Sequence, residues 1–308
     1  MMNEANQGVG ARLPRKEDDR FMRGRGRFVA DIKPAGVREV AFLRSPLAHA
    51  RIRGVRVPED IRDRVFLSND LNDVQPIKAV SALPGFKTSV QPVVAGDKVR
   101  HVGEIVGICV ADTRAEAEDL VARVEVDYEE LPAIHDMLQA REEGAALIHD
   151  EWGDNVFLES FVDVGDILAV AARATIKVER EFRTARQCMA PIEGRGVIAE
   201  WDTRLEQLVV HSATQMPHIV RSGMAECLGL DHGRIRIVAP DVGGGFGYKG
   251  ILLAEEVALG WLARHLRRPV RWIEDRREHL IGNANCREHH YKITGYADAD
   301  GRLIGLEA

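Results

Sequence analysis

The sequence is poor in cysteine, and its few cysteines are widely separated. Cys109, Cys188, Cys227 and Cys286 form no C-x-x-C pair. Iron–sulfur clusters and structural zinc sites are built from closely spaced thiolates. Neither kind of site is therefore predicted in this chain. Four scattered thiols fit a reducing compartment, so a cytoplasmic location is expected.

Long apolar runs and an excess of positive charge are also missing. Apolar runs extend over only a few residues, as at 168–172, whereas a bilayer-spanning helix needs about 20. The N-terminal segment lacks the apolar core of a signal peptide, so no membrane span or secretion signal is predicted. With 42 basic and 48 acidic residues the net charge is -6, which gives no general attraction to nucleic acid.

The length and composition that remain are those of a globular protein of about two domains. Of the 308 residues, 45% are hydrophobic and 29% are charged. Residues 1–20 are polar and predict a loosely held N-terminal arm. Residues 21–134 alternate strand and helix signals, which predicts a self-contained α+β domain. Residues 135–154 are irregular and predict a linker, and residues 155–308 form the second predicted domain.

The clearest local pattern of the first domain is a strand, a capped helix and another strand. A β-branched run over residues 105–110 leads to Thr113, whose hydroxyl can cap a helix while Glu116 reaches back to the cap. Residues 124–128 then alternate apolar and charged, which predicts a strand with one buried face. The three elements together resemble a βαβ unit.

The second domain contains two successive strand, loop and helix units. In the first, a strand over residues 205–213 leads through the loop 214–216 to a helix that opens at Pro217 and can end at Gly229. The buried stripe of this helix is predicted to consist of Ile219, Val220, Met224 and Leu228.

The loop of the second unit is rich in glycine. A strand over residues 234–240 leads into DVGGGFGYKG at 241–250, and a helix is predicted over 251–266. Both loops lie between the carboxyl end of a strand and the amino end of a helix, where ligands collect in α/β sheets. Free backbone N–H groups at such a place favour an oxyanion or a phosphate. Gln215 and the glycine loop are therefore predicted to surround one ligand.

A dinucleotide is one hypothesis for that ligand. Gly245, Gly247 and Gly250 have G-x-G-x-x-G spacing, and the acidic residues Glu274 and Asp275 end the next strand near the distance expected for a ribose contact. These residues would define an NAD-binding dehydrogenase. Three consecutive glycines with Phe246 among them nevertheless exceed what a pyrophosphate turn needs, and a Rossmann domain normally opens with its fingerprint. The plain alternative is a tight turn that only lets the helix pack closely on its strand.

An ordered set of motifs between residues 16 and 280 resembles a known family. The motifs are EDDRFMRGRGRFVADI, AFLRSPLAHARIRGV, VRHVGEIVGICVADTRAEAEDLVARVEVDYEELPAI, MAPIEGRGVIAEWD, SATQMPHIVRSGMAECLGL, IRIVAPDVGGGFGYK and RRPVRWIEDRREHL. They are similar to the large, molybdopterin-carrying subunit of the molybdenum hydroxylases, which include xanthine dehydrogenase, aldehyde oxidase and, closest in wording, carbon monoxide dehydrogenase. The resemblance implies an α+β fold, with an α/β hammerhead domain followed by the first part of a molybdenum-cofactor-binding α/β domain.

The resemblance implies a ligand other than NAD for the glycine loop. In the family this loop lies beside the molybdenum centre and turns its N–H groups toward an oxo group and the pterin, a role that falls here on Gly244, Gly245, Phe246 and Gly247. The glutamine of the family's TQ-x-PH segment, which hydrogen-bonds a molybdenum oxo ligand, matches Gln215. No residue of the chain is expected to ligate the metal, because the pterin dithiolene holds it.

Two further positions match family sites. Glu193, in PIEGRG, occupies a recurrent position, where a structural role with the carboxylate bonded to neighbouring backbone or to Arg195 is favoured over a substrate role. Gly250 stands where the xanthine-oxidising members have a substrate-binding glutamate, so the resemblance argues against purine oxidation.

The function implied is that of the N-terminal half of a molybdopterin-binding subunit. Such an enzyme oxidises an aldehyde, an N-heterocycle or a similar small molecule with water-derived oxygen. The implied cofactor is molybdopterin cytosine dinucleotide, and electrons would pass to partner subunits that carry a 2Fe-2S cluster and FAD.

Family features beyond the matched region include the substrate loop and the general-base glutamate. No catalytic residue is therefore assigned to this chain. A partner chain carrying the C-terminal half is expected, as are a terminal strand without a partner and inactivity of the isolated chain. An inactive truncated remnant is the remaining alternative.

Overall fold

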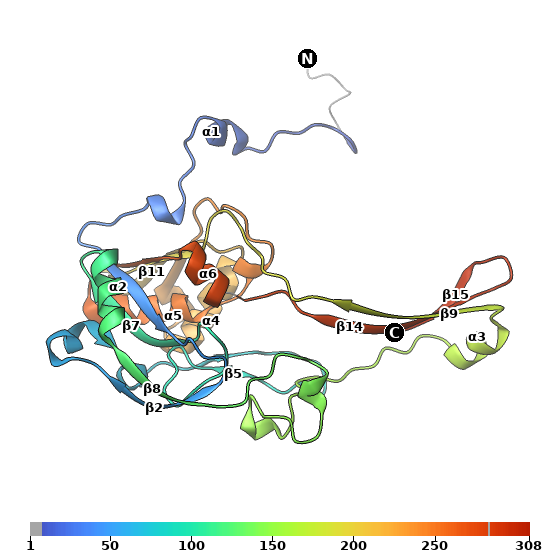
Figure 1. Ribbon diagram of the computed structural model, residues 1–308. Coiled ribbons are helices and arrows are strands. Elements are labelled where there is room, and N and C mark those ends of the chain that lie inside the picture. Colours follow the sequence, from blue (N-terminus) through green and yellow to red (C-terminus); the bar gives the residue numbers. More distant parts are fainter. Residues whose placement is uncertain (1–7, 283) are drawn as a thin grey trace, which may run out of the picture.

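The computed structural model describes residues 8–282 and 284–308. Figure 1 shows a rounded body from which an N-terminal arm and a long β-ribbon project. The expected arm at residues 1–20 lies partly outside the described residues, and its described part leads into α1 (Asp18–Met22). The ribbon consists of β9 (Ile176–Thr184), β14 (His289–Ala297) and β15 (Leu303–Glu307), with α3 (Ile167–Arg173) beside it.

A seven-stranded sheet forms the centre of the body and takes strands from both halves of the chain. Its order is β12 (Ile235–Val238), β11 (Gln207–Ser212), β10 (Gly196–Asp202), β13 (Val270–Ile273), β1 (Arg38–Arg44), β7 (Ile105–Ala111) and β3 (Val65–Phe66). At the junction of the halves β1 runs parallel to β13, with Arg38 opposite Val270. The prediction that residues 21–134 are self-contained is therefore wrong, because strands from this region pair with the second half. The domain and linker bounds themselves remain predictions.

The capped helix of the first half forms as expected, but its flanking strands separate. Helix α2 (Arg114–Arg123) begins after Thr113, whose Oγ1 accepts a hydrogen bond from the Glu116 N–H while the Glu116 carboxylate accepts one from the Thr113 N–H. The following strand β8 (Glu125–Glu130) pairs with β2 (Ala50–Arg56) in a second sheet. The predicted βαβ unit is therefore wrong, since β7 and β8 belong to different sheets.

Two longer helices of the second half follow β11 and β12 along the chain. Helix α4 (Pro217–Leu228) opens at its proline and ends at Gly229, whose φ of 61° is the left-handed cap that was expected. Helix α5 (Ala254–Leu266) begins at Ala254 rather than at residue 251, because Leu253 has extended backbone and its N–H donates to the Glu256 carboxylate at the start of the helix.

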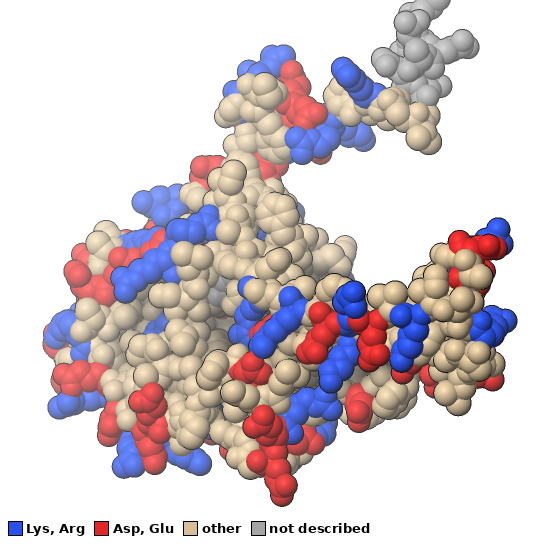
Figure 2. All heavy atoms as spheres, turned by 45° about the vertical axis from the view of Figure 1, so that its right-hand side comes forward, with Lys and Arg blue, Asp and Glu red and all other residues tan. Residues whose placement is uncertain are grey.

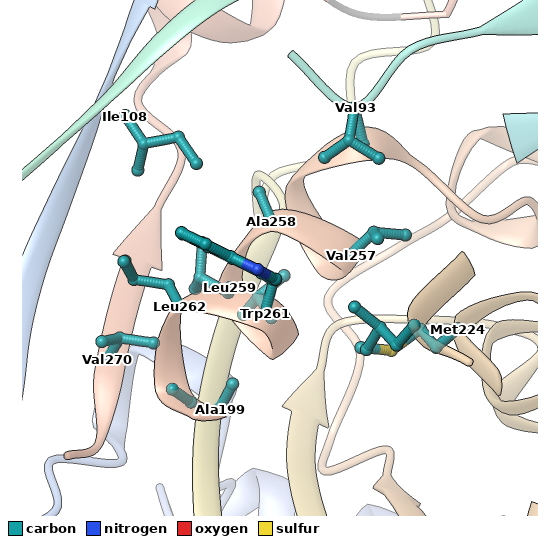
Figure 3. Packing of buried hydrophobic residues seen from close by; sticks show 14 of the residues in the cluster. Val93, Ile108, Ala199, Met224, Val257, Ala258, Leu259, Trp261, Leu262 and Val270 are labelled. Atoms are coloured by element: carbon teal, nitrogen blue, oxygen red, sulfur yellow. The ribbon is translucent and has the colours of Figure 1, made fainter. Parts of the chain in front are cut away.

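The main core lies where α5 packs against the body sheet. Figure 3 shows Leu259 and Leu262 of α5 close to Val270 of β13, with Met224 of α4 on another side. These four side chains have relative exposures of 0%. Packing on several sides leaves almost no part of α5 in water, which explains why this helix is apolar around most of its circumference.

The ribbon is a three-stranded antiparallel sheet with little core of its own. Each residue of β9 is exposed, and β14 pairs with β9 over its full length from His289 to Ala297. The terminal strand β15 pairs with β14. The expectation of a terminal strand without a partner is therefore wrong, although the ribbon still presents exposed apolar residues.

Short elements complete the described chain. They are β4 (Ile77–Lys78), β5 (Val90–Gln91), β6 (Lys98–Val99), α6 (Arg276–Gly282) and the 3₁₀ turns Val29–Asp31, Glu59–Arg64, Ser68–Asp70, Gln139–Arg141, Asp150–Trp152, His232–Arg234 and Tyr248–Gly250. Among the helices of the described residues, none combines the length and apolarity needed to cross a bilayer.

Candidate functional site

Gln215 lies directly against the glycine loop. Its Oε1 accepts a hydrogen bond from the Gly247 N–H at 3.0 Å. A Cβ added to Gly245 would lie 2.4 Å from the Gln215 Cδ. Only glycine therefore allows this approach without a shift of the side chain. The two segments that were predicted to surround one ligand lie together in the fold.

The backbone around Gln215 is held by the carbonyl of Lys249. This oxygen accepts hydrogen bonds from the Gln215 N–H at 2.9 Å and from the Thr214 Oγ1 at 3.0 Å. The same hydroxyl accepts a bond from the N–H of Met216, the residue before α4. The loop after β11 is thus fastened to the far end of the glycine loop.

The tip of the glycine loop presents unused donors. The N–H groups of Gly244, Gly245 and Phe246 donate no hydrogen bond to any part of the chain that the structure describes. Left-handed backbone at Gly244, Phe246 and Gly247, with φ of 94°, 55° and 88°, curls the loop. Consecutive N–H groups in such a curl form a concave site for anionic oxygen.

Phe246 adopts this left-handed backbone although it is not glycine. Such a conformation is unfavourable for a bulky residue and is most often found at functional sites. Its side chain is 71% exposed, so burial of the ring in the core does not account for the conformation. The positive φ of Phe246 contributes to the curl of the loop.

The Gln215 carboxamide is oriented as a donor. Its oxygen is engaged by Gly247, which leaves the NH₂ group without a partner among the described residues. This end of the site therefore offers neutral N–H donors, as does the loop tip. Neutral donors suit an oxo group or another anionic oxygen and do not suit a bare cation. In the described part of the chain no group of three or more His, Cys, Asp or Glu side chains could hold a metal.

Glu193 hydrogen-bonds residues at both ends of the glycine loop. Its Oε2 accepts hydrogen bonds from the Gly243 N–H at 2.7 Å and from the Lys249 Nζ at 2.8 Å. Of the two alternative partners expected for this carboxylate, backbone and Arg195, the structure shows the backbone, at Gly243. Sequence reasoning missed the contact of Lys249, because the sequence gives no local signal that this lysine is buried against Glu193.

Arg195 instead belongs to a buried ion-pair network with Glu255 and Glu274. Its guanidinium lies 2.8 Å from a carboxylate oxygen of each. Burial by itself would raise the pKa of Glu274, but Arg195 outweighs burial and holds that pKa below its usual value. Tyr248 and His279 also hydrogen-bond the Glu274 carboxylate.

This network contradicts the dinucleotide hypothesis. The Glu274 side chain has no exposed surface and its carboxylate is already engaged by several donors. A ribose hydroxyl cannot reach it, so Glu274 cannot play the part that an NAD site requires. Asp275, the other acidic residue after β13, pairs with Arg114 at 2.9 Å.

A groove of about 1010 Å³ opens beside the glycine loop. It separates the outer face of α4 from the β4–β5 hairpin. Ile219 is 46% exposed on its wall, so its predicted place in the buried stripe of α4 is wrong. Other lining residues are Ile77, Lys78, Val80, His218 and Gly250. Gly250 is the residue of the glycine loop that lines the groove, and the sequence carried no clear signal for this groove.

Comparisons with known proteins identify this architecture. The family described as "Molybdopterin cofactor-binding domain" matches residues 148–308, and the one described as "Aldehyde oxidase and xanthine dehydrogenase, a/b hammerhead domain" matches residues 23–132. The fold and these matches define an α+β protein with a hammerhead domain followed by a cofactor-binding domain, as expected. The chain belongs to the molybdenum hydroxylase family.

Individual relatives agree with this assignment. The chain is 34% identical to the nicotine 6-hydroxylase large subunit of Paenarthrobacter nicotinovorans and 31% identical to the carbon monoxide dehydrogenase large chain of Hydrogenophaga pseudoflava, covering 97% of this chain and 37% and 39% of those proteins. It superposes on quinoline 2-oxidoreductase from Pseudomonas putida 86 with a TM-score of 0.89 at 37% identity, over 96% of this chain and 38% of that one. The chain thus spans less than two fifths of these relatives.

Proposed function

We propose that this chain binds the molybdenum cofactor of a molybdenum hydroxylase through Gln215 and the loop 243–247. The observation that carries the proposal is the meeting of three unused N–H groups, from Gly244, Gly245 and Phe246, with the oriented amide of Gln215. These donors fit an oxo group and the polar edge of a pterin. The glycine at 245 fits as well, since a side chain there would occupy the space of the Gln215 amide.

When bound, the cofactor would supply two-electron oxidation chemistry. The chain's own contribution is to hold and orient it. The N–H groups of the loop tip would hydrogen-bond an oxygen without adding charge, and the amide of Gln215 would fix its direction. The groove beside Gly250 would admit the substrate, and apolar side chains such as Ile219 and Val80 would exclude water from part of its wall.

The substrate class that we favour is an N-heterocycle or an aldehyde. Relatives named nicotine 6-hydroxylase large subunit and quinoline 2-oxidoreductase support a flat heterocycle, and the mixed apolar and polar groove suits such a ring. Gly250 lines the groove and offers no carboxylate to a substrate at that position. We extend the proposal to the form of the cofactor, which would be molybdopterin cytosine dinucleotide. It also includes partner subunits that carry a 2Fe-2S cluster and FAD and accept the electrons, and a cytoplasmic location.

We also infer that the ribbon is covered by a part of a large subunit that lies outside these 308 residues. One face of the ribbon carries Val178, Phe182, Tyr291 and Leu306, which are 48%, 51%, 39% and 59% exposed. Helix α3 contacts the other face, since its Val170 lies where a side chain at Gly305 would be. Exposed apolar surface of this kind is typical of an interface.

The test is molybdenum content after expression in a host that makes the cofactor, with and without a polypeptide that supplies the rest of a large subunit. We expect molybdenum only in the complex, and about tenfold or greater loss of it in Gly245→Ala, whose new methyl group would collide with Gln215. Gly233→Ala is the matched control, because a methyl group there meets no atom within 4 Å. Val178→Lys should prevent the complex from forming.

Two results would overturn the proposal. Equal molybdenum in the Gly245→Ala and Gly233→Ala complexes would remove the loop from the cofactor site. Substrate turnover or stoichiometric molybdenum in the chain alone would contradict the need for another polypeptide, whereas a complex without molybdenum or turnover would favour an inactive remnant.

A further inference from the structure

One carboxylate oxygen joins the two ends of the glycine loop. The Glu193 Oε2 accepts the Gly243 N–H at the start of the loop and the Lys249 Nζ at its end. The Glu193 N–H also donates to the Gly243 carbonyl at 3.2 Å, so this start is held by both backbone and side chain. A Cβ at Gly243 would lie 2.5 Å from the Glu193 Cβ, and only glycine permits so close an approach.

Lys249 extends this connection to Gln215. Its side chain has no exposed surface, and Glu193 is 16% exposed. Its carbonyl, on the other side of the residue, accepts the backbone N–H of Gln215. A buried ammonium is unfavourable unless it is paired, and burial lowers the pKa of Lys249 while Glu193 opposes that effect. The position of Lys249 therefore depends on Glu193.

We propose that Glu193 and Lys249 are positioning residues that hold the glycine loop and Gln215 in one fixed arrangement. Glu193 acts on the near end of the loop directly and on the far end through Lys249. Lys249 transmits the constraint to the backbone of Gln215 through its carbonyl. Neither residue contacts the ligand in this scheme, and Glu193 has no substrate role. The connection stands independently of the ligand, whereas its value for cofactor binding rests on the proposed function.

Backbone amide exchange in the purified chain tests the connection residue by residue. Lys249→Met removes the hydrogen bond from the Lys249 ammonium group to Glu193 but keeps the backbone carbonyl that accepts the Gln215 N–H. We expect the amides of Gly247 and Gln215 to exchange at least about tenfold faster in this variant, while that of Gly243 stays protected. Glu193→Ala should accelerate exchange at all three amides. Glu193→Gln keeps an acceptor oxygen without the charge, so it should restore part of the protection.

A matched control uses the other buried lysine that is paired with a single carboxylate. The Lys98 Nζ lies 3.0 Å from Asp150, and the Lys98 side chain is 5% exposed. Asp150→Asn should leave exchange in the glycine loop unchanged. If Lys249→Met is too unstable to study, the double variant Lys249→Met with Glu193→Gln removes both charges and should still show fast exchange at Gly247 and Gln215.

The possible outcomes separate this inference from the proposed function. Parental exchange rates at Gly247 and Gln215 in Lys249→Met, or equal acceleration by Asp150→Asn, would overturn the positioning role. The expected exchange pattern combined with unchanged molybdenum content in the complex would uphold the positioning role and would count against the cofactor role of Gln215.

Discussion

The body and the ribbon are both β-sheets with alternating side chains, yet they differ in what covers them. In the body, α5 lies on the sheet, and Val270 and Trp272 of β13 are 0% and 2% exposed. In the ribbon, Val178 and Phe182 of β9 occupy comparable alternating positions but remain about half exposed. Figure 2 shows charged side chains of both signs following one another along the projecting segment. Alternation therefore defines two faces without defining what covers either one.

Their charged groups differ in the same way. In the body, Arg44 and Arg195 lie between Glu255, Glu274 and Glu278 with almost no access to water. In the ribbon, Arg183 pairs with Asp136 and Glu288 while 47% of its own side chain is exposed. Water screens the ion pairs of the ribbon and not those of the body. Ion pairs of similar length therefore differ in how much stability is lost when one partner is removed.

The largest expected effect comes from removing the central arginine of the body. Arg195→Met leaves Glu255 and Glu274 buried with less compensation, so we expect the free energy of unfolding to fall by about 3–5 kcal/mol. Urea denaturation measures the change. Arg183→Met in the ribbon is the matched substitution and should leave the unfolding midpoint almost unmoved. Similar shifts for both variants would contradict the distinction between the two regions.

The body sheet could be predicted only in part, for a physical reason. Local signals located α2, α4 and several strands, among them β7, β11 and β12, because capping residues and alternation act within a few residues of sequence. Pairing of β1 with β13 joins residues more than two hundred positions apart, and no local pattern encodes that choice. The sheet that unites the two halves was therefore missed, as were its strands β1, β3 and β10.

At the candidate site, the proximity of Gln215 and the glycine loop was easier to predict than the contacts that hold them. Gln215 and the glycines were identified because glycine frees backbone donors and because the motif resembles a family. The Lys249 contact was missed, since a lysine after a glycine run is ordinarily a surface residue. Its burial depends on Glu193, which is supplied by a segment 56 positions away, and on the network around Tyr248. Contacts between residues so distant in the sequence can be identified only from the folded structure.

A smaller effect, of up to about 3 kcal/mol, is expected from a buried carboxyl group in the body. Burial raises the pKa of Glu256 from 4.5 to about 7. The folded protein thus holds a proton that the unfolded chain releases, and the free energy of unfolding falls as the pH rises between these values. Glu256→Gln keeps the acceptor for the Leu253 N–H and should remove this decline.

Urea unfolding at a series of pH values between 4 and 8 measures this pH dependence of the free energy of unfolding. The variant should gain stability over the parent toward pH 8, with little difference near pH 4. Glu179→Gln on β9 is the ribbon control, because its carboxylate is 71% exposed, and it should leave the pH dependence unchanged. Parallel curves for Glu256→Gln and the parent would show that Glu256 is already ionised in the folded state.

The smallest expected effect compares two helix caps. Thr113 caps α2 in the body, and Asp166 caps α3 beside the ribbon by accepting the Ala169 N–H at 2.9 Å. Thr113→Ala should lower the free energy of unfolding by about 1 kcal/mol, because α2 packs its Ala117 and Leu120 into a core cluster and unfolds with it. No residue of α3 is buried, so Asp166→Ala should leave the midpoint unchanged and instead accelerate amide exchange within α3 alone. A shift of the global midpoint by Asp166→Ala would mean that the ribbon unfolds together with the body, and the two regions would then be one cooperative unit despite their different exposure.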